Sequence, residues 1–86
     1  MANILDIKKE LASRVRTRRK EAEISQIELA ERSGVSLGSI KRFESIGEIS
    51  LVSLLRIAVV LGYEDDFHKL FERTNYQSLD EVINAK

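Results

Sequence analysis

Apolar residues in the first part of the chain recur every three to four positions between charged ones, which is typical of helices with a single buried face. The first such segment covers about residues 6–22, and its apolar stripe consists of Ile4, Ile7, Leu11, Val15 and Ala22. The stripe has one gap, which Arg18 or Arg19 must fill. The pattern therefore predicts a long first helix with a basic outer face.

Serine and glycine residues divide the middle of the chain into shorter helices. A serine hydroxyl can accept a free backbone N–H at a helix start, and glycine readily adopts the left-handed conformation that ends a helix. The starts are marked by Ser25, Ser36 and Ser50, and the ends by Gly34, Gly47 and Gly62. The predicted third helix covers about residues 37–45. The residues expected to face inward are Leu29, Ala30, Ile40, Phe43, Leu51, Leu54, Leu55, Ala58 and Leu61.

The last part of the chain predicts one further helix and an extension. Residues 64–73 begin with three acidic residues, which suit the first turn of a helix, and their apolar side consists of Phe67, Leu70 and Phe71. Residues 78–81 repeat a capping-box pattern, and Val82 and Ile83 after it fit a short helix or an edge strand. We expect residues 1–73 to form one all-α domain of five helices. Residues 74–86 are expected to form a C-terminal extension that could belong to a dimer interface.

Two short helices joined by a glycine turn form the core of a helix-turn-helix unit. Here Gly34 supplies the turn, and Ala30 is small enough for the two helices to cross closely. Val35 and Ile40 are expected to pack between the helices and fix their crossing angle. The third helix would then project as a ridge that fits the major groove of duplex DNA.

Charge is distributed unevenly along the 86 residues, although the net charge is zero. Residues 1–42 carry ten Lys or Arg and six Asp or Glu, whereas residues 43–86 carry four and eight. The two parts therefore differ in sign, +4 against −4, which suits a protein with one face for DNA and another for protein.

Composition disfavours several classes of protein. The chain has no cysteine, and its one histidine, His68, has no metal-ligand companions, so neither a disulfide nor a metal site is expected. No pair of nucleophile and base is visible, so we expect neither an enzyme nor a cofactor. The longest apolar run, residues 57–61, is too short to cross a membrane, and the first ten residues do not resemble a signal peptide. A cytoplasmic protein is expected.

Residues 13–44, SRVRTRRKEAEISQIELAERSGVSLGSIKRFE, resemble the phage repressor and Cro type of helix-turn-helix, also called the XRE family. The following SLVSLLRIAVVLG resembles the fourth helix of that family, and the similarity extends over about residues 11–71. The resemblance implies a five-helix, phage repressor-like domain with a short C-terminal extension. It also implies a transcription regulator that binds specific double-stranded DNA sequences as a homodimer on a palindromic operator.

The resemblance assigns roles to individual residues. Gln26 would contact a phosphate, and Arg42 is the best candidate for direct base readout, because a guanidinium can pair bidentately with guanine. Arg19 and Glu44 match a pair that joins the first helix to the end of the third in some members. The set expected at DNA is Arg16, Ser25, Gln26, Ser36, Leu37, Gly38, Ser39, Lys41 and Arg42. A dimer interface is expected at Phe67, Leu70 and Phe71.

Other features of the sequence favour two alternative functions. Leu37 and Gly38 stand where many family members have hydrogen-bonding side chains, and Glu48 would repel a phosphate. Together with the zero net charge, they favour a protein-interaction module that has lost DNA binding. Residues 51–82 also resemble regulators encoded beside HipA-type kinase toxins, which implies a HipB-like antitoxin that binds an operator and a toxin protein together.

Overall fold

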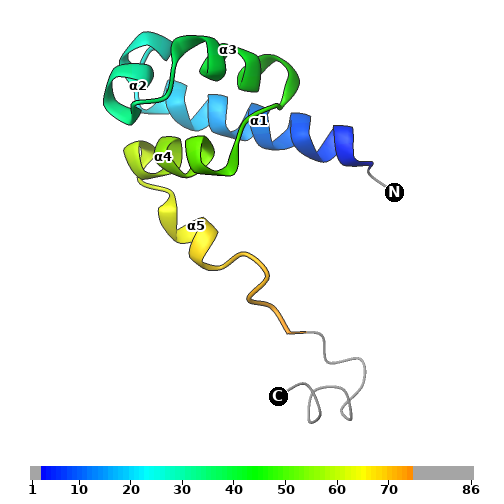
Figure 1. The fold of residues 1–86 in the computed structure, drawn as a ribbon. Helices are drawn as coiled ribbons and strands as arrows, with labels where there is room; N and C mark the ends of the chain where they lie inside the picture. The colour runs from blue at the N-terminus through cyan, green and yellow to red at the C-terminus, as the bar shows by residue number, and fades with distance from the viewer. Residues whose placement is uncertain (1–2, 75–86) are drawn as a thin grey trace, which may run out of the picture.

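The computed structural model describes residues 3–74, and this part of the chain consists of helices, turns and loops (Figure 1). Its five helices are α1 (Ile4–Glu21), α2 (Gln26–Ser33), α3 (Leu37–Ile46), α4 (Leu51–Leu61) and α5 (Glu64–His68). The predicted all-α fold is therefore confirmed. Within residues 3–74, each helix is too short or too polar to cross a lipid bilayer. The expectations for residues 78–83 lie outside the described residues.

Serine caps and left-handed glycines set the bounds of the three central helices. Before each of α2, α3 and α4, a serine hydroxyl accepts the backbone N–H three positions later, at 3.0–3.1 Å. After each helix, a glycine lies in the left-handed region, with φ of 74°, 76° and 81°. The caps are Ser25, Ser36 and Ser50, and the glycines are Gly34, Gly47 and Gly62, as the sequence predicts.

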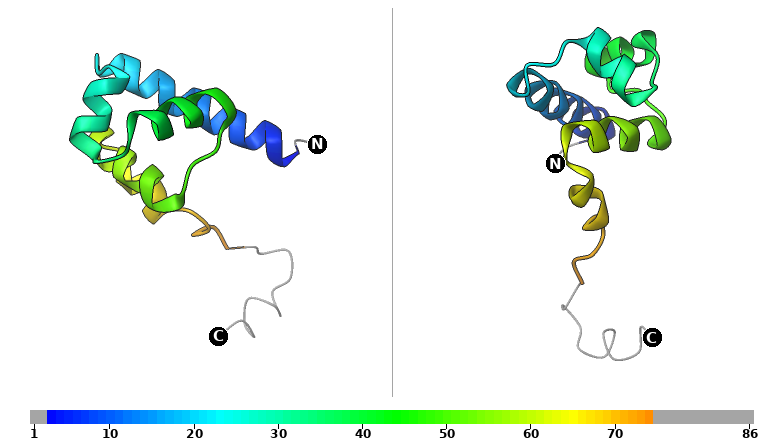
Figure 2. Two further views of the ribbon diagram at one scale, coloured as in Figure 1. Left: turned by 45° about the horizontal axis from the view of Figure 1, so that its top comes forward. Right: turned by 90° about the vertical axis from the view of Figure 1, so that its left-hand side faces the viewer.

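The helices are arranged around α1. In Figure 1, α2 and α3 lie above α1, and α4 lies below it. α1 packs against α3, and α2 packs against both α3 and α4. α5 packs against α4 and leads away from the other helices, as both views in Figure 2 show. The helix-turn-helix unit and α5 therefore lie at opposite ends of the molecule.

The core lies where the first four helices meet. One cluster of buried residues consists of Ile24, Leu29, Val35, Ile40 and Ile57. A second cluster consists of Ala12, Phe43 and Leu54. Val15 and Ile49 are partly buried and pack against both clusters, so the two form one continuous core. This core anchors α3 to α1 on one side and to α2 and α4 on the other.

Two of the predicted apolar faces are only partly buried. Ile4 and Ile7 in α1 are exposed, as is Ala22 directly after its end, and Ile4 reaches 78% exposure. The first turns of α1 extend beyond the neighbouring helices, so no other helix of residues 3–74 covers them (Figure 1). Arg19 is buried and fills the gap in the stripe. In α4, Leu51 is 65% exposed, and Ile57 is the residue that joins the core instead.

α5 is shorter than the sequence predicts. The expected helix covered residues 64–73, but α5 ends at His68, and Phe71 has a φ of 61°, outside the right-handed helical region. Leu70 is 57% exposed and Phe71 is 100% exposed, so they do not belong to the core of the described chain. A short helix in water depends on tertiary packing, and without it the pattern of residues 69–73 is insufficient to continue the helix.

Candidate nucleic-acid interface

Hydrogen bonds close the turn between α2 and α3. Gly34 has a φ of 74°, and its N–H donates to the carbonyl of Ala30 at 3.0 Å. The buried hydroxyl of Ser33 accepts the N–H of Val35 at 3.1 Å, and Val35 is itself buried. These contacts fix the direction in which α3 leaves α2. Sequence reasoning did not identify Ser33, because a serine at the end of a helix has the pattern of a surface residue.

Burial of one side of α3 determines which of its residues face solvent. Ile40 and Phe43 are almost completely buried, so the opposite side is turned outward. That side consists of Gly38, Lys41, Arg42 and Ser45, which are exposed and spaced three, four and seven positions from Gly38. We call these four residues the α3 ridge. Ser45 was missed by sequence reasoning, although the same helical spacing would have identified it.

The beginning of α3 presents few free polar groups. The Ser36 hydroxyl accepts the N–H of Ser39 at 3.1 Å and donates to the Ser39 hydroxyl at 2.8 Å. Leu37 and Ser39 are half-buried, whereas Gly38 is exposed and a Cβ there would have open space around it. Close approach of another molecule to this end of α3 is therefore easiest at the backbone of Gly38.

Gln26 and Arg16 lie beside the carboxylate of Glu44, where α1, α2 and α3 meet. Gln26 Nε2 donates to Glu44 Oε1 at 3.1 Å, and Arg16 Nε lies 3.9 Å from the same oxygen. An amide nitrogen carries two hydrogens, so Gln26 keeps one for another acceptor. The Arg16 side chain remains 55% exposed. Glu44 therefore positions two donors that still reach the surface.

Arg19 and Glu44 form a buried ion pair that is also held by hydrogen bonds. Arg19 Nε and Nη2 donate to the two carboxylate oxygens of Glu44, and Arg19 Nη1 donates to the carbonyl of Ile24 at 2.8 Å. The two side chains are only 10% and 5% exposed. A two-pronged guanidinium–carboxylate contact restricts both side chains to one relative orientation. The pair therefore ties the end of α1 to the last turns of α3.

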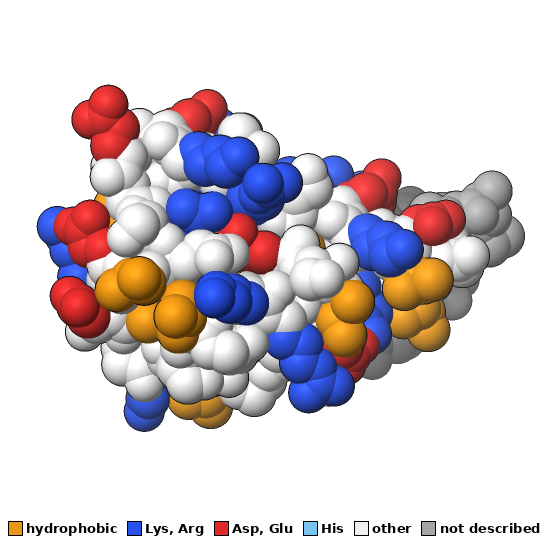
Figure 3. All heavy atoms as spheres, turned by 90° about the horizontal axis from the view of Figure 1, so that it is seen from above, with side chains coloured by type: hydrophobic (Ala, Val, Ile, Leu, Met, Phe, Trp, Pro, Cys, Tyr) orange, Lys and Arg blue, Asp and Glu red, His pale blue; other side chains and the backbone are white. Residues whose placement is uncertain are grey.

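Basic side chains gather on the face that α2 and α3 form. In Figure 3, which looks onto this face, several Lys and Arg side chains lie around the middle, a few acidic atoms lie between them, and further Asp and Glu lie at the left edge. Glu48, in the loop after α3, forms an ion pair with Lys8, so a neighbouring cation offsets its charge. Gly47 beside it lies so close to α1 that a Cβ would be 2.9 Å from the Cβ and carbonyl oxygen of Lys8. The loop is thus seated on α1.

The residues expected at a dimer interface lie away from the α3 ridge. Phe67 is half-buried in α5, and Leu70 and Phe71 follow the end of this helix. α5 leaves the molecule on the side opposite to α3 (Figure 1). Among the described residues, His, Cys, Asp and Glu side chains form no group that could hold a metal ion.

A short helix, a glycine turn and a second helix with one buried side and a partly basic outer ridge define a helix-turn-helix domain of the DNA-binding type. The sequence profile of the helix-turn-helix family matches residues 15–67, which is more than half of the chain. The chain therefore belongs to this family, the XRE type of DNA-binding regulators. No curated protein and no solved structure matches the chain.

Proposed function

We propose that this protein regulates transcription by placing α3 in the major groove of a specific duplex DNA sequence, as a homodimer on a palindromic operator. The observation that carries the proposal is the α3 ridge, which is exposed along its whole length. The opposite side of α3 is buried in the core, so the ridge is held rigidly. The major groove is wide enough to admit an α-helix.

Each group on this face suits one type of DNA contact. Arg42 can pair bidentately with a guanine in the major groove, and Lys41 can neutralise a phosphate. Ser25 and Gln26 stand at the start of α2, where backbone N–H groups and the free amide hydrogen of Gln26 suit another phosphate. Arg16 adds a cation beside them. We therefore expect α2 to set the position on the DNA backbone and α3 to read the bases.

Direct readout of bases is expected at few positions. Leu37 can contact a thymine methyl group but cannot form a hydrogen bond with a base, and Gly38 offers only its backbone. Ser36 and Ser39 hydrogen bond to each other. Arg42 would then provide most of the hydrogen-bonded readout. The remaining specificity is expected from the shape and deformability of the DNA.

A homodimer is proposed because a single reading helix gives a small footprint for tight operator binding. The fully exposed side chain of Phe71 supports this proposal, because a second copy would remove its apolar surface from water. Leu70 is exposed next to it, and Phe67 is half-buried in the same region. A two-fold dimer places its reading helices about 34 Å apart on one face of the duplex, which requires inverted half-sites.

The test is selection of the purified full chain against a random duplex library, with affinity for the selected sequences measured over a range of salt concentrations. We expect two inverted half-sites with centres about 10 base pairs apart. Affinity should fall steeply as salt rises, because contacts to phosphates release counterions. Feeble binding without enrichment would contradict the proposal, and would favour a protein-interaction module or an antitoxin that requires its partner.

A further inference from the structure

An apolar groove lies between α1, α4 and α5, on the side of the molecule away from the α3 ridge. Its volume is about 320 Å³. Its apolar lining includes Leu11 and Val15 from α1, Leu54 and Leu61 from α4, and Phe67 and Leu70 from the region of α5. The groove is open because α5 packs against α4 and leads away from the other helices (Figures 1 and 2). Apolar side chains here are therefore left partly in water.

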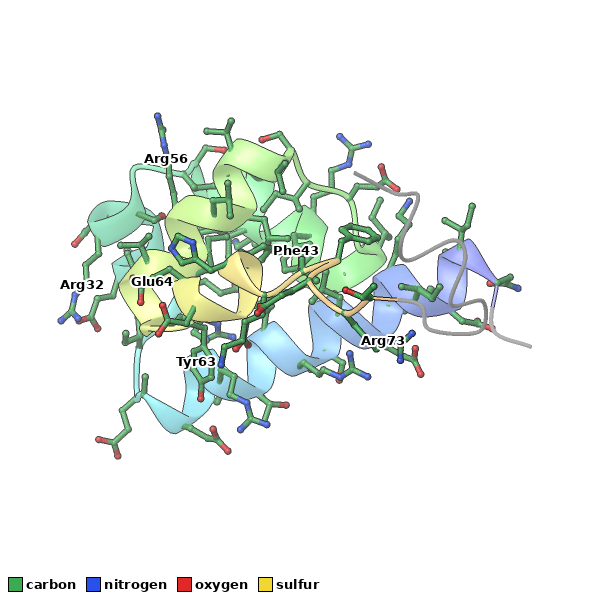
Figure 4. All side chains as sticks on the ribbon, turned by 90° about the horizontal axis from the view of Figure 1, so that it is seen from below. Arg32, Phe43, Arg56, Tyr63, Glu64 and Arg73 are labelled. Carbon is green, nitrogen blue, oxygen red and sulfur yellow. The ribbon has the colours of Figure 1, made fainter. Side chains whose placement is uncertain are left out.

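Basic side chains border this groove along α1. Arg14 and Arg18 line one edge, and Tyr63 and Asp66 lie on the side of α5. Figure 4, which looks at the molecule from below, shows Tyr63 beside α1. A hydrogen bond to Glu21 and the charge of that carboxylate raise the pKa of Arg18 above its usual value. Arg18 thus already has an anionic partner.

Arg14 differs from Arg18 because it has no ion-pair partner among the described residues. The groove therefore combines an apolar floor with one cation that is available to an incoming carboxylate. The segment that best fits it is amphipathic and acidic, with apolar side chains on one face and at least one carboxylate beside them.

The chain itself carries such a segment. Residues 79–83 read LDEVI, a pattern that would bring Leu79, Val82 and Ile83 to one face of a helical turn, with Asp80 and Glu81 between them in the sequence. Residues 75–86 contain these two acidic residues and one lysine, so their net charge is negative. This sign is opposite to that of the basic edge of α1. The apolar pattern complements the floor of the groove, and the negative charge complements its α1 edge, across from Asp66 on the side of α5.

The connection between the groove and this segment is short. Leu70 lines the groove, and Leu79 follows it after nine positions, which can span at most about 30 Å. A covalent connection of this length keeps the segment at an effective concentration of about millimolar near the groove. The same chain therefore supplies the segment more readily than a second copy at ordinary protein concentrations.

We propose that residues 79–83 of the same chain dock in this groove, with Leu79, Val82 and Ile83 on its apolar floor and an acidic side chain against Arg14. Docking covers Phe67 and Leu70, which line the groove, so that of the three residues expected at a dimer interface only Phe71 is left for a second copy. Phe71 itself does not line the groove. The proposal goes beyond DNA recognition and does not depend on it.

Paired cysteines test this contact in the full chain, which has no cysteine of its own. The variant Leu11→Cys with Val82→Cys places one thiol in the groove and one in the segment. Under mild oxidation, its disulfide should form within one chain and several-fold faster than in the control Ile27→Cys with Val82→Cys, whose first position lies exposed on α2. Equal rates would overturn the proposal. A disulfide that joins two chains would also overturn it, because the groove would then take the segment of a second copy.

A second measurement does not depend on disulfide geometry. Leu79→Asp with Ile83→Asp places charges on the face that docks, whereas the control Asn84→Asp adds charge without removing an apolar side chain. The double variant should shift the amide resonances of the groove residues of α1 and α4 and leave those of α3 unchanged. The control should shift neither. Unchanged groove resonances in the double variant would overturn the proposal, and because no DNA is present, this result would leave the proposed DNA binding untouched.

Discussion

Arg19 and Glu44 stand 25 positions apart in the chain, yet the guanidinium of Arg19 donates to both carboxylate oxygens of Glu44, at 2.7 and 2.9 Å. Glu44 also accepts a hydrogen bond from Gln26, which opens α2. One carboxylate on α3 is therefore bonded to side chains of α1 and α2. The orientation of α3 is thus tied to both α1 and α2.

Loss of one partner of this pair should cost a large part of the stability. Glu44→Ala leaves the charge of Arg19 buried without its carboxylate, and such a change lowers the free energy of unfolding by about 3–5 kcal/mol. Urea denaturation followed by circular dichroism measures the loss. The control Arg32→Gln removes the exposed pair with Glu28 and should cost less than about 0.5 kcal/mol. Similar losses in both variants would contradict the role assigned to the buried pair.

Gly47 and Gly62 form a matched pair for testing how the loop after α3 sits on α1. Both have positive φ, 76° and 81°, so alanine at either position should cost about 1–2 kcal/mol through the backbone alone. Only at Gly47 would the new Cβ also meet α1, at 2.9 Å from Lys8. Gly47→Ala should therefore lower the melting temperature clearly more than Gly62→Ala. Equal decreases in melting temperature would mean that the loop can move away from α1 without loss of stability.

Arg42 is the residue whose removal should change sequence preference. Arg42→Ala is expected to weaken binding to the selected operator by about 1–3 kcal/mol and to relax the preference at one base pair. Fluorescence anisotropy with the operator and with its single-base variants measures both effects. Arg73→Ala removes the same charge from the region beyond α5, on the face shown in Figure 4, and should leave the preference intact. Unchanged affinity of Arg42→Ala would show that α3 reads DNA through other residues.

Phe71 is the residue on which the proposed dimer depends most directly. Phe71→Asp places a charge in the expected apolar interface, where burial without a partner is costly, and should yield monomers. Sedimentation equilibrium gives the mass, and circular dichroism shows that the helices persist. Ile4→Asp changes another exposed apolar side chain, at the start of α1, and should remain dimeric. If Phe71→Asp is folded and still dimeric, the interface lies elsewhere.

Local features of this fold could be predicted because their causes lie within a few residues. The hydroxyl of Ser36 reaches an N–H only three positions along the chain, and Gly34 reaches the carbonyl of Ala30 one turn back. Such contacts depend on residue type and spacing, both of which are visible in the sequence. The α3 ridge follows in the same way once Ile40 and Phe43 are assigned to the core.

The partners within the site could be predicted only in part. Arg18 and Arg19 both fit the gap in the apolar stripe of α1, and the spacing does not distinguish them. Arg19 is buried because Glu44 and the carbonyl of Ile24 together bind its guanidinium, and both belong to later parts of the chain. The link between Gln26 and Glu44 depends on the same tertiary arrangement.

By itself, the sequence determined the all-α class, the ends of the central helices and the helix-turn-helix unit, because periodicity and capping act locally. The tertiary structure decided which apolar residues are buried. Ile4 shares its periodicity with Val15, but the first turns of α1 extend past their neighbours and leave Ile4 in water. α5 ends at His68, and the apolar residues that follow, Leu70 and Phe71, are exposed. Periodicity identifies the side of a helix that can be buried. Burial itself requires that a neighbouring helix lie alongside the same turns.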